Sequence, residues 1–168
     1  MAIPSDTQTS PPAIHIDTDI LRGMLDTTGK DDLYAIGRHI SNSIRKTAPL
    51  GVSIPAIGET FHGLSEDRNM ESSDCGDAAI ALRKLVQTGK LILVGMGGTK
   101  EVYSIAQELM RSDDRLDPVD ALILSVACKC KSCNTFYTTD GTILQSISIA
   151  NVAKTHGVKI REPPFSEM

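Results

Sequence analysis

Segments with the pattern of β-strands alternate with segments of helical periodicity along the whole chain. Residues 91–94 (LILV) show this most clearly, because the all-apolar run follows a helix-like segment at 77–87 and a glycine at position 89. An all-apolar strand is typical of a parallel sheet that is covered on both faces, and glycine commonly follows the last residue of a helix. Alternating strands and helices favour a parallel sheet flanked by helices, with right-handed crossovers. The sequence therefore predicts an α/β fold.

The other expected elements follow from hydrophobic periodicity and capping residues. Strands are expected at residues 13–17, 50–54, 91–94, 135–138 and 158–160, the last at an edge of the sheet. Helices are expected at residues 20–25, from 33 to near Pro49, and at 55–64, 77–87, 99–111, 118–127 and 147–154. The 168 residues suffice for one domain core and are too few for two. We expect this domain to span residues 13–161, between a flexible tail at 1–12 and a short tail at 162–168.

Composition excludes several classes of protein. A net charge of -4 disfavours nucleic-acid binding driven by overall charge, so any RNA contact would depend on local basic residues such as Arg22 and Arg38. The apolar runs at 91–96 and 121–128 are far shorter than the roughly 20 residues of a membrane span. The polar segment at 1–12 lacks the features of a secretory signal. We expect a cytoplasmic protein with reduced thiols and no membrane contact.

Four carboxylates stand where a parallel sheet would bring them together. Asp17 and Asp140 follow two predicted strands, and Glu59 and Asp120 lie near the start of two predicted helices. Ligands of open parallel sheets bind beyond the carboxyl ends of the strands. Unit charges about 4 Å apart repel by roughly 4 kcal/mol at an effective dielectric constant near 20, so such a cluster needs a cation. Oxygen ligands without histidine suit Mg²⁺ or Mn²⁺, which can activate water and clamp a phosphodiester.

Each of these acidic residues also has a purely structural explanation. Asp17 can cap the following helix, and Glu59 can offset the partial positive charge of a helix start. Asp117 and Asp120 fit an acidic variant of the capping box. Asp140 belongs to an Asp-Gly pair between two β-type segments, which is a hairpin signal. Taken singly, none of the four indicates a site.

Taken together, four segments resemble the PIN-domain nucleases, a family that includes the VapC-type toxins. The segments are AIHIDTDIL, IPAIGETF, LDPVDALILSVA and FYTTDGTIL. In order and spacing they match a strand ending in Asp, a helix-borne Glu, an Asp in a D-A-x-I helix and a strand ending in T-x-D. The resemblance covers residues 14–160. It implies a PIN-like three-layer α/β/α sandwich with a central parallel sheet, in which a helix instead of a hairpin follows Asp140.

The resemblance also implies a catalytic site that hydrolyses RNA phosphodiester bonds. Asp17, Glu59, Asp120 and Asp140 would be the catalytic residues, with the three aspartates holding Mg²⁺ or Mn²⁺. Glu59 would orient a water ligand or accept a proton from the attacking water. Thr138 would hydrogen-bond a carboxylate as an auxiliary residue. The products would be a 5′-phosphate and a 3′-hydroxyl, and the protein would be a homodimer with an antitoxin or another protein as its partner.

Three positions depart from the family pattern or extend it. Many members carry a second acidic residue two positions after the last Asp, where this chain has Thr142, so a second metal position would be weaker or empty. Asp19 stands at a place often held by Asn or another small polar residue and could add an oxygen near the metal. Asp117 lies one helical turn before Asp120 and could be an outer ligand.

The cysteines give a competing signal. Cys128, Cys130 and Cys133 form a C-x-C-x₂-C pattern, and Cys75 lies far upstream. Four thiolates would suit Zn²⁺ or an iron–sulfur cluster, but this spacing is not that of a zinc ribbon, and free thiols explain the pattern better. The sequence thus favours a metal-dependent ribonuclease, with two alternatives. One is a non-catalytic PIN-like module that binds RNA or protein in an RNA-processing complex, and the other is a thiol-bound metal sensor.

Overall fold

The computed structural model of the protein describes residues 11–45 and 48–164, so residues 1–10 and 165–168 of the predicted tails lie outside it. The strands are β1 (Ile14–Ile16), β2 (Leu50–Ser53), β3 (Leu91–Val94), β4 (Thr135–Tyr137) and β5 (Lys159–Arg161). The helices are α1 (Thr18–Leu25), α2 (Tyr34–Ser43), α3 (Ile54–Glu66), α4 (Ser72–Gln87), α5 (Thr99–Ser112), α6 (Pro118–Lys129), α7 (Gly141–Gln145) and α8 (Ile147–Thr155). In this part of the chain, no helix is both long and apolar enough to cross a membrane.

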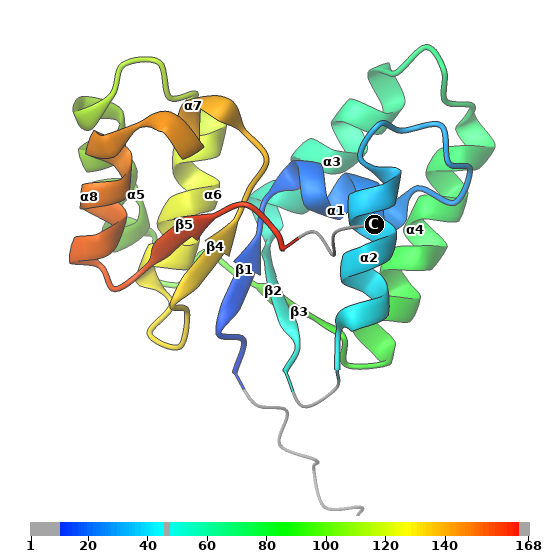
Figure 1. Ribbon diagram of the computed structural model, residues 1–168, viewed down its shortest axis with the longest axis horizontal. Helices are drawn as coiled ribbons and strands as arrows, with labels where there is room; N and C mark the ends of the chain where they lie inside the picture. The colour runs from blue at the N-terminus through cyan, green and yellow to red at the C-terminus, as the bar shows by residue number, and fades with distance from the viewer. Residues whose placement is uncertain (1–10, 46–47, 165–168) are drawn as a thin grey trace, which may run out of the picture.

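The five strands run parallel in one sheet, in the order β3-β2-β1-β4-β5. From β1 the chain adds β2 and β3 on one side and then returns to add β4 and β5 on the other. Because crossovers between parallel strands are right-handed, this reversal puts the connecting helices on opposite faces of the sheet. Figure 1 shows α1–α4 on one side of the sheet and α5–α8 on the other. The predicted α/β/α sandwich with a central parallel sheet is confirmed.

The strand order reverses between β1 and β4, and this is where the fold makes a crevice. The two strands are paired at their carboxyl ends, with Ile16 beside Tyr137. The chain leaves β1 through α1 toward one face and leaves β4 through α7 toward the other. Such a point of divergence is the usual ligand site of an open parallel sheet. The strands themselves form a rigid base, because Ile16 and Phe136 are each 1% exposed.

Helix α4 begins at Ser72, whereas the sequence pattern predicted a start at residue 77. Its first turn is fixed by Asp74, whose carboxylate accepts a hydrogen bond of 2.8 Å from the backbone N–H of Glu71. This is half of a capping box, and it satisfies one of the backbone donors that a helix start leaves free. The first turn has no apolar periodicity, so hydrophobic spacing could not reveal it.

Helix α2 ends at Ser43, earlier than the predicted end near Pro49. The Ser43 hydroxyl donates a hydrogen bond of 2.8 Å to the carbonyl of His39, and Ile44 is already extended. Arg45 and Ala48 then form an isolated antiparallel bridge that turns the chain toward β2. Ile44 continued the helical spacing of apolar residues without belonging to the helix, because it packs against the core from an extended backbone.

Candidate active site

A pocket of about 270 Å³ lies at the carboxyl edge of the sheet, beside the ends of β1 and β4. It is lined by all four carboxylates that the sequence singled out, namely Asp17, Glu59, Asp120 and Asp140. The other lining residues are Thr18, Asp19, Arg22, Thr60 and Gly63. We call this hollow the acidic pocket. Residues that are far apart along the chain therefore meet at the place where the topology provides a crevice.

Asp17 is the most deeply buried carboxylate of the acidic pocket, at 3% exposure. It ends β1 and caps α1, and its Oδ1 accepts a hydrogen bond of 2.8 Å from the backbone N–H of Thr18. Its Oδ2 accepts a hydrogen bond of 2.6 Å from the hydroxyl of Thr138. Burial raises the pKa of Asp17 to about 6, although both hydrogen bonds lower it. The structural role of Asp17 as a helix cap and its place in the pocket are thus compatible.

Asp120 approaches the other carboxylates from the first turn of α6 and is half-buried. Burial and, to a lesser extent, the negative charges of Asp17, Glu59 and Asp140 together raise its pKa to about 7. Asp117 does not line the pocket. It is exposed, and its Oδ1 accepts a hydrogen bond of 2.8 Å from the backbone N–H of Val119, so it caps α6.

Glu59 is held by a neighbour that the sequence analysis did not single out. The hydroxyl of Thr18, the first residue of α1, donates a hydrogen bond to Oε2 of Glu59 on α3. Thr18 thus positions two carboxylates. Its backbone N–H holds Asp17, and its hydroxyl holds Glu59. Asp19 in the same turn accepts a hydrogen bond of 3.2 Å from the hydroxyl of Thr139, which ties it to the chain beyond β4.

Asp140 starts a helix and not a hairpin, as the family resemblance implied. Its Oδ1 accepts a hydrogen bond of 2.9 Å from the backbone N–H of Ile143, which caps α7. Its own N–H donates a hydrogen bond of 3.0 Å to the hydroxyl of Thr138. Thr138 is completely buried and therefore links Asp17 to the turn that carries Asp140. The predicted hydrogen bond from Thr138 to a carboxylate is confirmed.

The donor set of the acidic pocket fits a hard divalent cation. Its carboxylate oxygens are ligands that Mg²⁺ and Mn²⁺ prefer, and a cation would offset the mutual repulsion that raises the pKa of Asp120. Among the described residues, no three His, Cys, Asp or Glu side chains are already arranged as a metal site. Asp17, Asp120 and Asp140 would therefore have to draw closer around a cation.

We expect Asp120→Asn to stabilise the protein in EDTA at pH 8. A raised carboxyl pKa means that the folded state binds the proton more tightly than the unfolded state, so stability falls as pH rises from about 4 through about 7. The variant lacks this penalty. A rise in pKa from 3.8 to about 7 corresponds to about 4 kcal/mol at 1.36 kcal/mol per pKa unit, and because solvent screens the half-buried carboxylate we expect about half of this, a gain of about 2 kcal/mol at pH 8. Urea denaturation at several pH values would measure this difference.

The same experiment carries its own control, because the stability advantage of the variant should shrink toward about pH 3, below the ordinary carboxyl pKa of 3.8, where Asp120 is largely protonated in both the folded and the unfolded state. Titrating groups that do not interact with Asp120, such as buried His15, whose pKa burial lowers to about 4, affect both proteins equally. A variant that is less stable than wild type at pH 8 would contradict the repulsion argument.

The cysteines do not form a metal site in the described part of the chain. All four are free thiols, and Cys128 and Cys133 are 6% and 5% exposed. Burial raises the pKa of Cys133 to about 11 and that of Cys128 to about 12, so both remain protonated at neutral pH. Cys75 lies on α4, across the sheet from Cys128 on α6. Cys128 and Cys133 therefore contribute buried thiols to the core.

Buried, protonated thiols should resist alkylation, because the thiolate is the reactive species. We expect iodoacetamide at pH 8 to leave Cys128 and Cys133 unmodified in the folded protein, whereas the partly exposed Cys75 and Cys130 react. Peptide mass spectrometry would locate the label, and protein in guanidinium chloride, in which all four should react, is the control. Rapid native labelling of Cys128 would show that α6 does not pack as described.

Sequence reasoning missed some residues of the pocket and undervalued one. Thr18 and Thr60 line it, and the first could have been noticed because it directly follows Asp17 at a helix start. Arg22 was one of several basic candidates without an assigned place, and it lies in the wall of the acidic pocket. Gly63 also lines the pocket, one helical turn after Glu59 on α3, and no sequence signal marked it.

Comparison with known proteins places the fold but gives no close relative. No protein family and no curated protein matches the sequence. A chain of VapBC2 from Rickettsia felis, solved bound to a DNA fragment from its promoter, has a TM-score of 0.54 and 13% identity, with 89% of this chain and 97% of that chain covered. A chain of FitAB, solved bound to an IR36 DNA fragment, has a TM-score of 0.55 and 15% identity, with 92% of this chain and 98% of that chain covered. A chain of FitAcB from Neisseria gonorrhoeae has a TM-score of 0.50 and 17% identity, with 89% of this chain and 97% of that chain covered. The PIN-like fold expected from the sequence is thereby confirmed.

Proposed function

We propose that this protein is a metal-dependent endoribonuclease that hydrolyses RNA phosphodiester bonds. The observation that carries the proposal is the convergence of Asp17, Glu59, Asp120 and Asp140 in one pocket at the reversal of strand order. A scaffold has no need of four carboxylates that repel one another, because their repulsion costs stability. The likeness in fold to chains of VapBC2 and FitAB adds support, since the sequence segments that contain these carboxylates resemble the VapC-type nucleases.

Asp17, Asp120 and Asp140 would hold Mg²⁺ or Mn²⁺. When bound, the cation supplies Lewis-acid chemistry, which activates water and neutralises charge on the phosphoryl oxygens. Glu59, oriented by Thr18, would accept a proton from the water that attacks phosphorus. The bond from phosphorus to the 3′-oxygen would break, leaving a 5′-phosphate and a 3′-hydroxyl that takes its proton from solvent. Through its two hydrogen bonds, Thr138 would fix the position of Asp17 relative to the turn that carries Asp140.

We further propose that the protein works with a protein partner, as a toxin with an antitoxin does. The support is that two structures of similar fold are complexes named VapBC2 and FitAB, each solved with bound DNA. A partner that covered the acidic pocket would silence the nuclease. A homodimer of this chain remains a prediction, which light scattering of the purified protein would test.

The test is cleavage of a generic single-stranded RNA by the purified protein with Mg²⁺, Mn²⁺ or EDTA. We expect cutting with either metal, none in EDTA, and 5′-phosphate ends on the products. RNA binding without cleavage under all metal conditions would favour the non-catalytic RNA-binding module instead. A narrow target preference is addressed by using total RNA as a second substrate and mapping the new ends.

A further inference from the structure

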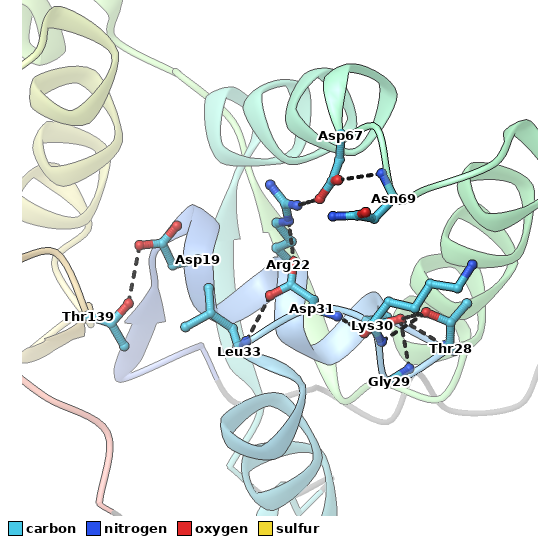
Figure 2. A network of polar contacts seen from close by, with 11 residues as sticks. Asp19, Arg22, Thr28, Gly29, Lys30, Asp31, Leu33, Asp67, Asn69 and Thr139 are labelled. Atoms are coloured by element: carbon cyan, nitrogen blue, oxygen red, sulfur yellow. Dashed lines mark hydrogen bonds and ion pairs between the residues drawn. The ribbon is translucent and has the colours of Figure 1, made fainter.

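Arg22 lies at the boundary between the acidic pocket and a neighbouring hollow. It is in the last turn of α1, and its side chain lines both cavities. The second hollow measures about 440 Å³ and is lined mainly by polar and charged residues, including Lys30, Asp31 and Asp67. Figure 2 shows Arg22 between these two aspartates. The guanidinium is therefore well placed to act on whatever enters the acidic pocket.

Two of the three guanidinium nitrogens are already engaged. Nε donates to Oδ2 of Asp31, and Nη2 donates to Oδ2 of Asp67. The side chains of Arg22, Asp31 and Asp67 are only 23%, 6% and 22% exposed, so these ion pairs are partly shielded from water. The aspartates come from the loop after α1 and from the end of α3, and they fix the guanidinium from two directions. Arg22 is thereby held in one orientation before any ligand arrives.

The third nitrogen, Nη1, lies beside Gly63, a residue that lines the acidic pocket. Among the described residues it has no hydrogen-bond partner, and in Figure 2 it points away from both aspartates. A Cβ built on Gly63 would lie 3.3 Å from Nη1, so this nitrogen lies against the pocket wall at the one residue without a side chain. Gly63 lines the acidic pocket and not the neighbouring hollow. Nη1 thus offers two N–H donors beside the carboxylates.

We propose that Arg22 binds a backbone phosphate of the RNA strand through Nη1, next to the bond that is cut. This inference rests on the proposed function and adds a substrate-binding residue to it. A guanidinium suits phosphate because its planar N–H groups match phosphate oxygens, and its charge is permanent. Ordering by Asp31 and Asp67 reduces the side-chain entropy lost on binding. The acidic pocket otherwise has no cationic side chain to meet a polyanion.

The experiment uses two substitutions that disturb the binding of phosphate by Nη1 in different ways. Arg22→Gln removes the guanidinium together with its ion pairs. Gly63→Ala keeps the ion pairs and places a methyl group against Nη1, so it tests the contact if Arg22→Gln fails to fold. Lys30→Gln is the matched control, because Lys30 is a cation of the neighbouring hollow that does not line the acidic pocket. Thermal denaturation reports the stability of each protein.

Binding is measured in the background of Asp17→Asn, so that the RNA survives. The probe is a short RNA whose phosphates are replaced one at a time by neutral methylphosphonates, followed by fluorescence anisotropy. We expect one position near the cut where the replacement weakens binding about tenfold in the otherwise unchanged protein and in Lys30→Gln. At that position Arg22→Gln should bind the normal and the neutral RNA equally well, because the interacting partner is already gone. A merely structural role of Arg22 would not produce this dependence on one phosphate.

The outcomes separate this inference from the proposed function. The same methylphosphonate profile in Arg22→Gln and Gly63→Ala as in the parent protein would overturn the inference, even if the wild type cleaves RNA. A phosphate that depends on Arg22 in a protein that never cleaves would support phosphate binding by Arg22, but it would overturn the nuclease proposal and with it the placement of that phosphate next to a cut bond. Failure of the parent protein to bind RNA would overturn the inference as well.

Discussion

Asp17→Asn is expected to reduce RNA cleavage by about a thousandfold or more while leaving the fold intact. Asp17 is the most buried member of the acidic pocket and the one that touches both neighbouring elements, through Thr18 and Thr138. The amide has nearly the shape of the carboxylate but lacks the negative charge that would hold a divalent cation. Loss of a group on which charge stabilisation depends typically lowers rates by two to four powers of ten, and we use about a thousandfold.

The measurement is initial cleavage rate with Mn²⁺, together with circular dichroism and urea denaturation. Asp32→Asn is the matched control, because Asp32 is exposed and lines only the neighbouring hollow. That variant should cleave within about twofold of wild type. Burial raises the pKa of Asp17 above its ordinary value, so the neutral amide should also stabilise the metal-free protein at pH 8. An Asp17→Asn variant with wild-type activity would remove Asp17 from the mechanism.

Gly37→Ala should be severely destabilising although Gly37 lies outside the pocket, lowering the free energy of unfolding by at least about 3 kcal/mol. Helices α1 and α2 cross so closely that a Cβ on Gly37 would lie 1.9 Å from the carbonyl carbon of Gly23. The obstacle is backbone, which cannot rotate away as a side chain can. The two helices would have to separate, and α1 carries Asp17, Thr18 and Asp19 at its start. We therefore expect lower cleavage activity as well.

Gly76→Ala is the control for helix propensity. Gly76 lies in α4 with nothing within 4 Å of an added Cβ, so alanine should raise stability by about 0.5–1 kcal/mol. Urea denaturation of the three proteins gives both changes. Equal stability of Gly37→Ala and wild type would mean that α1 and α2 do not cross as closely as described.

The carboxylates of the candidate site could be predicted from the sequence, whereas the place of Arg22 could not. Asp17, Glu59, Asp120 and Asp140 were identifiable only as a set. They lie at strand ends or in the first turns of helices, which parallel strands bring to one edge, and their segments together resemble a known family. Arg22 could not be ranked among the other basic residues, since nothing local distinguishes an arginine held by Asp31 and Asp67 from an exposed one. Its partners are 9 and 45 positions away, and only packing selects them.

The sequence by itself determined the layer architecture and the carboxylate set. The alternation of strands and helices predicts a parallel sheet between two helix layers, and right-handed crossovers then leave few arrangements of the strands. The all-apolar run at 91–94 was expected to be covered on both faces, but β3 is an edge strand and Leu93 is 43% exposed. Tertiary structure decided which atoms meet. It set the strand order that puts β1 beside β4, the contact between Gly23 and Gly37, and the direction of Nη1 of Arg22. These depend on contacts between residues distant in the sequence, whose energies are settled by packing the whole chain at once, whereas periodicity and capping act within a few turns.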